Sequence, residues 1–125
     1  MNTVSKITTA ILVILISLLS CNKDKDRVEM GLSDEYYVKY VIKGNGTYIY
    51  FSDFSVNTDQ GNVSFSGYQY HSWNQTYGPV KKGFRASVSV ESSLVTVEIY
   101  VSKNNGPFAL KASKSDGGSS YTIDF

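Results

Sequence analysis

The sequence has one cysteine, one histidine and two prolines among its 125 residues. One cysteine cannot form an intramolecular disulfide, and one histidine gives too few ligands for a zinc site, which takes three or four Cys, His or carboxylate groups. A surplus of charge is also missing, because the chain beyond Lys6 carries 11 basic and 11 acidic residues. Phosphate binding needs clustered Lys and Arg, so this balance argues against nucleic acid as a partner.

Good helix formers are scarce after residue 35. Val, Ile, Tyr, Ser and Thr dominate that part, and all ten Tyr, six Phe and the single Trp lie within it. Such a composition favours β-strands. The length allows one domain at most.

The N-terminus has the order of a secretory signal peptide over residues 1–20. Lys6 ends a short positive segment, residues 7–19 are almost entirely apolar, and the small residue Ser20 follows. An apolar run of this length is too short to span a bilayer, since about 20 residues are needed. We expect the segment to be removed after export.

Leu18-Leu19-Ser20-Cys21 resembles the lipobox of bacterial lipoproteins, with Leu three residues before the cysteine and a small residue directly before it. The resemblance implies cleavage between Ser20 and Cys21 and attachment of diacylglycerol to the Cys21 thiol. Leu19 stands where smaller residues are usual. A plain signal peptide with a free thiol at Cys21 and an uncleaved membrane anchor are the alternatives.

Residues 21–35 are interpreted as the lipidated cysteine followed by a flexible tether. The charged run 22–27 resembles the segment that directs some lipoproteins to the outer leaflet, and a solvated linker is the alternative. Several acyl chains hold a protein firmly on a membrane, because each buried CH₂ contributes about 0.8 kcal/mol. We therefore expect a lipid-anchored protein of the bacterial cell envelope, at the outer membrane.

From Tyr36 onward the chain alternates with a period of two, and turn residues interrupt it about every ten residues. This pattern predicts an all-β domain over 36–125, a small antiparallel Ig-like β-sandwich of about seven strands with Trp73 between the sheets. Tyr36, Val38, Tyr40 and Ile42 are expected on one buried face. The strands are predicted at 36–42, 47–56, 63–70, 84–90, 95–101, around 108–112 and toward 125, with 84–90 and 95–101 as a hairpin and 71–82 irregular.

The run 38–44 (VKYVIKG) resembles the opening strand of the mycobacterial membrane protein small family, the exported β-sandwich accessories of large lipid transporters. Runs 73–76 (WNQT), 83–84 and 97–101 (VEIYV) stand where that family has its Trp segment, its approach to a hairpin and a later strand. The resemblance implies a β-sandwich with a transport-accessory role. This chain lacks the two cysteines that pair in many members, and it has a lipobox in place of their membrane helix.

No catalytic constellation emerges from the polar residues. His71, the one base for a serine triad, has no glycine-framed serine near it. Residues 57–61 (NTDQG) offer oxygen ligands for calcium but lack the acidic first position, and an ordinary hairpin turn is the favoured interpretation. A small envelope hydrolase using exposed carboxylates stays open as the alternative function. The acids on predicted strands are Asp53, Glu91, Glu98 and Asp124.

The most suggestive cluster is a set of rings that lie close together in the sequence. Amphipathic rings presented together favour contacts with sugars or proteins, although a small sandwich also needs large side chains in its core. The favoured function is a non-catalytic binding or transport-accessory module, without cofactor or metal, that contacts an envelope protein, a transporter or a glycan. The cluster is Tyr68, Tyr70, His71, Trp73 and Tyr77.

Replacing Cys21 by Ala should abolish labelling of the protein by a fatty-acid probe, because the thiol that would carry the diacylglycerol is removed. The substituted protein should keep its leader or appear in soluble form. Gel fluorescence after metabolic labelling measures the outcome, and undiminished labelling would show that Cys21 is not the lipidated residue.

Overall fold

The computed structural model describes residues 33–125, and all regular secondary structure in that range is β-strand. The signal peptide, Cys21 and the tether up to residue 32 lie outside the described residues. Within that range no helix is long and apolar enough to cross a membrane. The strands are β1 (Tyr36–Gly44), β2 (Phe54–Thr58), β3 (Gly61–Phe65), β4 (Ser72–Val80), β5 (Arg85–Val90), β6 (Val95–Lys103), β7 (Ala109–Lys114) and β8 (Gly118–Thr122).

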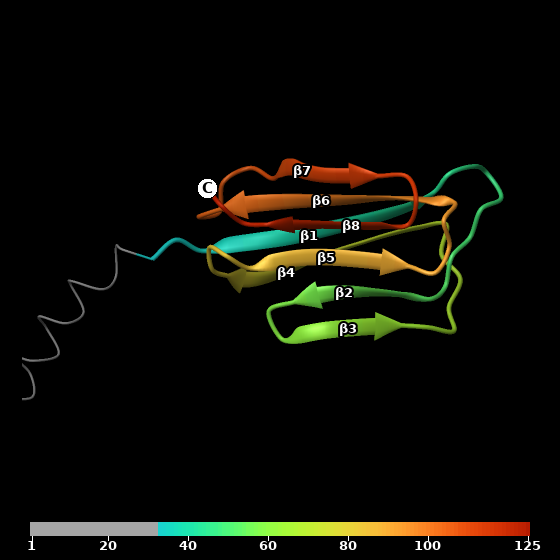
Figure 1. The fold of residues 1–125 in the computed structure, drawn as a ribbon, viewed down its shortest axis with the longest axis horizontal. Helices are drawn as coiled ribbons and strands as arrows, with labels where there is room; N and C mark the ends of the chain where they lie inside the picture. The colour runs from blue at the N-terminus through green and yellow to red at the C-terminus, as the bar shows by residue number, and fades with distance from the viewer. Residues whose placement is uncertain (1–32) are drawn as a thin grey trace, which may run out of the picture. The chain divides into compact units, whose positions relative to one another are not determined.

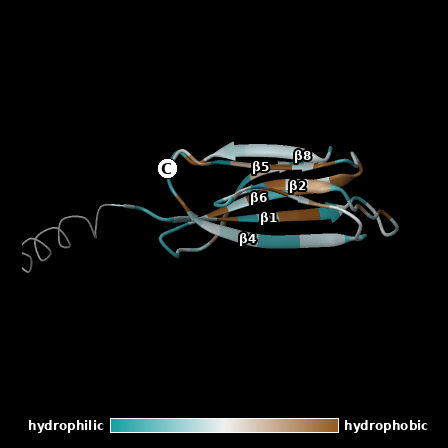
Figure 2. Ribbon diagram, turned by 90° about the horizontal axis from the view of Figure 1, so that it is seen from below, coloured by the Kyte–Doolittle hydropathy of each residue, from teal (hydrophilic) through white to brown (hydrophobic). Residues whose placement is uncertain are grey.

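These strands form two antiparallel four-stranded sheets (Figure 1). One sheet has the order β4-β1-β6-β7 and the other the order β3-β2-β5-β8. Seen along the layers, β2, β5 and β8 lie in one layer and β1, β4 and β6 in the other (Figure 2). The predicted antiparallel β-sandwich is therefore confirmed, with eight strands in place of about seven.

The core lies between the sheets and follows the period-two alternation of the central strands. Four inward side chains of β1 are each exposed by 1% or less, as the sequence predicted: Tyr36, Val38, Tyr40 and Ile42. β1 pairs with β6 along its whole length, from Tyr36 opposite Lys103 to Gly44 opposite Val95. The apolar face of β6 is buried in the same way, so these two strands form the centre of the core.

The Tyr40 hydroxyl joins the two sheets by hydrogen bonds. It donates to the carbonyl of Asn57 at 2.6 Å and accepts from the backbone N–H of Ser87 at 3.1 Å. Asn57 lies on β2 and Ser87 on β5, so a side chain of one sheet satisfies backbone groups of two strands in the other. Burial raises the pKa of this hydroxyl well above its ordinary value, and Tyr40 stays protonated.

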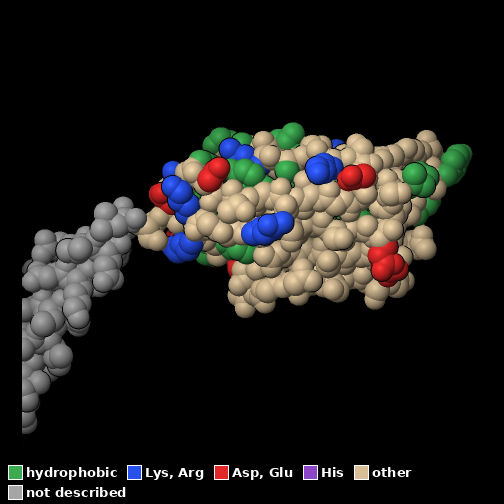
Figure 3. All heavy atoms as spheres, viewed as in Figure 1, with side chains coloured by type: hydrophobic (Ala, Val, Ile, Leu, Met, Phe, Trp, Pro, Cys, Tyr) green, Lys and Arg blue, Asp and Glu red, His purple; other side chains and the backbone are tan. Residues whose placement is uncertain are grey.

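The outer face of the sheet β3-β2-β5-β8 carries small hydroxyl and amide side chains. Ser55 on β2 lies opposite Ser64 on β3 and Ser89 on β5, and Asn57 lies opposite Asn62. Figure 3 shows this face with few charged side chains across its middle. The exposed side chains of this face are therefore mostly small and polar.

The prediction of a strand over residues 47–56 is wrong for most of that range. Residues 45–53 form a loop with one isolated bridge at Phe51, and β2 begins only at Phe54. The loop is needed because β1 and β2 belong to different sheets. It folds back closely over Gly44, where an added Cβ would lie 2.3 Å from the Ile49 carbonyl oxygen.

Residues 71–82 were expected to be irregular, but most of them form the edge strand β4. Exposed Asn74 and Gln75 hide its alternation, and Pro79 is tolerated because the strand is at an edge. The hairpin expected at 84–101 is also wrong, because β5 and β6 lie in different sheets. Two successive strands that each have one buried face and are joined by a short link can form a hairpin within one sheet. They can equally lie in the two different sheets.

Several aromatic and aliphatic side chains near the C-terminus point outward. Phe108 is 38% exposed, and Leu110 is more exposed still. Leu110 points outward because a register irregularity between Ile99 and Tyr100 shifts the pairing of β6 with β7. Phe125 is also partly exposed, although its backbone carbonyl accepts a hydrogen bond from the Tyr36 hydroxyl. Ile123, two residues earlier, is buried.

Replacing Tyr40 by Phe should lower the free energy of unfolding by about 1–3 kcal/mol, since the Asn57 carbonyl and the Ser87 N–H lose their buried partner. Chemical denaturation of the full chain measures the change. Tyr68→Phe, which removes a hydroxyl from an exposed ring, should leave stability within about 0.5 kcal/mol. Equal stabilities of the two variants would refute the inter-sheet role of Tyr40.

Candidate functional site

Two loops meet at the end of the sandwich where β1 finishes at Gly44, which we call the far end. The β1–β2 loop (45–53) and the β3–β4 loop (66–71) are joined by two backbone hydrogen bonds of 2.8 Å between Phe51 and Tyr70. The N–H of Gly44 also donates to the carbonyl of His71 at 2.9 Å. These bonds hold both loops against the body of the sandwich.

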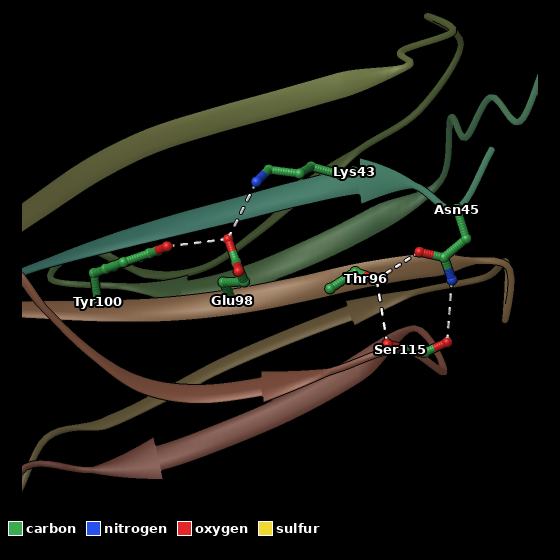
Figure 4. A network of polar contacts seen from close by, with 6 residues as sticks. All are labelled: Lys43, Asn45, Thr96, Glu98, Tyr100 and Ser115. Atoms are coloured by element: carbon green, nitrogen blue, oxygen red, sulfur yellow. Dashed lines mark hydrogen bonds and ion pairs between the residues drawn. The ribbon is translucent and has the colours of Figure 1, made fainter. Parts of the chain in front are cut away.

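The far end is additionally connected to the β7–β8 turn by side chains (Figure 4). The Asn45 amide donates to the Ser115 carbonyl at 3.3 Å, and the Thr96 hydroxyl donates to the Asn45 side-chain oxygen. Asn45 therefore ties the start of the β1–β2 loop to both neighbouring segments. The loop leaves the sheet from a fixed position.

The structure divides the five residues of the predicted aromatic cluster into two groups. Trp73 and Tyr77 lie on β4 and pack against the core. Tyr70, within the β3–β4 loop, is half-buried, whereas Tyr68 is 66% exposed and His71 is exposed. Only Tyr68 and His71 are thus presented to solvent at the far end.

Trp73 contacts the opposite sheet at the open edge between β3 and β4. Its ring centroid lies 4.8 Å from that of Phe54 on β2 and 5.2 Å from that of Phe65 on β3. Phe54 and Phe65 also stack on each other at 4.8 Å. Phe51 and Tyr70 continue this group toward the far end. The five rings form an aromatic column that closes one edge of the sandwich.

Tyr77 belongs to the other part of β4, beside the central tyrosine of the core. Its ring lies 6.2 Å from the ring of Tyr40. Burial, and secondly the charge of Asp59, raises the pKa of Tyr77. The contribution of this residue is to packing.

Two exposed tyrosines of the far end were not among the predicted site residues. Tyr48 is 86% exposed and Tyr50 is 54% exposed, and the Tyr50 ring lies 5.6 Å from that of His71. The sequence carried one signal for them: the run 48–51 (YIYF) has aromatic residues on both faces, which suits a loop better than a half-buried strand. Tyr48, Tyr50 and Tyr68 are called here the far-end tyrosines.

The far-end tyrosines lie on loop segments that carry no charged side chain, and the one acid of the β1–β2 loop, Asp53, is at its end. Residues 45–52 and 66–71 contain no Lys, Arg, Asp or Glu. Figure 3 shows side chains of the hydrophobic class, which includes Tyr, projecting at this end of the molecule. Protein interfaces are enriched in Tyr and depleted of charge at their centres, so the composition is that of a contact surface.

His71 has a structural contact that accounts for its position. Its Nδ1 lies 2.9 Å from the carbonyl oxygen of Ile49. A carbonyl only accepts, so Nδ1 carries the hydrogen and links the two loops. This bond orients the imidazole toward the loop backbone.

The four acidic residues considered for hydrolysis occupy three separate places. Asp53 and Glu91 line one open pocket of about 320 Å³, together with Ser55, Ser64 and Ser89, and the N–H of Glu91 donates to the carbonyl of Asp53. Glu98 lies on the outer face of the other sheet, 3.6 Å from the Lys43 ammonium. Asp124 accepts a hydrogen bond from the Tyr121 hydroxyl at 2.7 Å.

The segment considered for calcium, residues 57–61, forms the turn between β2 and β3. The Thr58 hydroxyl accepts from the N–H of Gln60 and donates to the carbonyl of Gly61. The Asp59 carboxylate accepts from the Gln60 side chain at 3.2 Å, and the Asn57 carbonyl accepts from Tyr40. These oxygen atoms thus already have partners within the protein. Across residues 33–125 the structure brings no three His, Cys, Asp or Glu side chains together as a metal site.

Replacing Trp73 by Ala should destabilise the domain by about 3 kcal/mol, at the lower end of the range for large aromatic truncations, because Trp73 is only partly buried. Thermal or chemical unfolding of the full chain measures the loss. Tyr48→Ala is the matched control, because this ring is 86% exposed and lies outside the aromatic column, and it should change stability by less than about 0.5 kcal/mol. A harmless Trp73 substitution would mean that the aromatic column does not hold the edge closed.

The resemblance to the mycobacterial membrane protein small family implied a β-sandwich, and the structure has that architecture. The lipobox lies outside the described residues and stays a prediction. Comparison with known proteins finds no family model, no curated protein and no solved structure that matches this chain.

Proposed function

We propose that this protein is a lipid-anchored, non-catalytic binding module of the bacterial cell envelope, which contacts its partner through the far-end tyrosines. The observation that carries the proposal is the presence of three largely exposed tyrosines on two hydrogen-bonded loops, in segments 45–52 and 66–71 that carry no charged side chain. Exposed apolar side chains that stand singly are normal, whereas a group of them at one end of a small domain marks an interaction surface.

The direction of the chain supports this use of the far end. The anchor would be at Cys21, and β1 begins at Tyr36, at the opposite end of the sandwich from Gly44. Nine residues of β1 span about 30 Å at roughly 3.3 Å per residue. The domain thus holds the far-end tyrosines a full strand length from the point where the tether joins it.

The chemistry of the surface favours a protein or a glycan as the partner. Tyrosine has few rotatable bonds, so ordering it on binding costs little entropy, and its hydroxyl adds a hydrogen bond at the rim of the contact. The hydrogen-bonded loops are already held in place, which lowers the cost of binding further. A transporter component of the envelope is one such protein partner, as the family resemblance implies.

A small hydrolase remains the second candidate, and its support is the pocket shared by Asp53 and Glu91. Two carboxylates beside one cavity are the minimum for glycoside hydrolysis. We favour the binding module because Phe54 and Phe65, the two rings that line this pocket, are already packed against each other and against Trp73 in the aromatic column.

A photo-crosslinking amino acid placed at position 50 in the native cells should give a discrete adduct, because the Tyr50 side chain would lie in the contact. The same amino acid at position 62 is the control, since Asn62 is exposed on β3 and outside the far end. Gel separation and mass spectrometry of the adduct measure the result. Equal adducts at both positions, or none at position 50, would refute binding through the far-end tyrosines.

A further inference from the structure

A second surface lies on the outer face of the sheet β4-β1-β6-β7. It is a shallow hollow of about 280 Å³ beside the β6–β7 turn. Two rings form part of its lining, and the remaining lining groups are hydroxyls, an amide and a glycine. The lining residues are Tyr37, Thr76, Ser102, Asn105, Gly106 and Phe108.

The strands and the turn fix the walls of this hollow. Tyr37 on β1 lies opposite Ser102 on β6, and the Ser102 hydroxyl donates to the Gly106 carbonyl at 2.7 Å. Asn104 and Asn105 both adopt positive φ, which shapes the turn, and the N–H of Asn104 donates to the carbonyl of Glu35. The hollow is therefore preformed, as small-ligand sites usually are.

Lys39 supplies a positive charge at the border of the hollow. Its ammonium lies 4.9 Å from the ring centroids of both Tyr100 and Phe108, and Phe108 also lines the hollow. Lys39 makes no ion pair with any carboxylate in the described part of the chain. The neighbouring acid on this face, Glu98, is engaged by Lys43 and by the Tyr100 hydroxyl (Figure 4).

We propose that this hollow binds an acidic saccharide, with a sugar ring against Tyr37 and Phe108 and its carboxylate near Lys39. The C–H face of a sugar packs on aromatic rings, and its hydroxyls suit the hydroxyl of Thr76 and the amide of Asn105. The volume suits a single sugar ring, and the mixed lining does not suit an acyl chain. The Lys39 ammonium already lies over rings and lacks an anion, so a carboxylate completes the site.

This site is on a different face from the far-end tyrosines and does not depend on the proposed function. Its test uses the full chain, purified in detergent, with tetragalacturonate as the acidic probe and cellotetraose as the neutral one. Isothermal titration should show that tetragalacturonate binds at least about tenfold more tightly, which is the effect of one charge-assisted contact. Added salt should weaken the binding.

Three variants locate the charge. Lys39→Gln should weaken tetragalacturonate binding about tenfold, whereas Lys39→Arg keeps the charge and should retain most of the affinity. Lys43→Gln is the matched control, because Lys43 lies on the same strand and face but pairs with Glu98. Binding by Lys43→Gln should equal that of the unchanged protein.

Phe108→Ala tests the ring, which also contacts the Lys39 ammonium, and should weaken binding about fivefold, in line with the loss of one aromatic contact. Phe108 is partly exposed, so the fold should survive the substitution, and circular dichroism checks this. The proposal is overturned if tetragalacturonate shows no binding, if cellotetraose binds equally well, or if Lys43→Gln is as damaging as Lys39→Gln.

Discussion

The hydrogen bonds of the Tyr40 hydroxyl are the constraint on which the rest of the sandwich depends. Apolar side chains hold two sheets together without specifying how one sheet is placed over the other, because hydrophobic attraction has little directionality. Tyr40 adds direction, since its hydroxyl must meet Asn57 on β2 and Ser87 on β5 at once. With β1 placed over those two strands, the positions of the remaining strands follow from pairing within each sheet.

The aromatic column packs the two sheets together at one edge of the sandwich, whereas Tyr40 acts at its centre. Trp73, Phe54 and Phe65 close the opening between β3 and β4, where neither strand has a further neighbour in its sheet. Because the column continues through Phe51 and Tyr70 into the two far-end loops, the same packing that closes the edge also positions those loops. Stability and the presentation of Tyr48, Tyr50 and Tyr68 are therefore linked.

The two proposed contact surfaces differ in the physics they would use. The far-end tyrosines lie on loop segments without charged side chains, and a partner there would be held by apolar area and by hydroxyl hydrogen bonds. The hollow beside Lys39 combines rings with a fixed ammonium, and a ligand there would be selected by its charge. A short sandwich can carry both because its loops and its outer sheet faces are separate surfaces.

The sequence by itself determined the architecture and the central core. Alternation with a period of two appears wherever one face of a strand is buried, so β1, β5 and β6 and their inward side chains could be predicted. Edge strand β4 and the loop at 45–53 could not, because half-exposed strands and aromatic loops share the same local pattern. Whether two neighbouring strands pair or cross between sheets depends on contacts distant in sequence, as β5 and β6 show. For the same reason only the tertiary structure decided which aromatic residues face water: Trp73 is covered by rings from the other sheet, and Tyr48 has none above it.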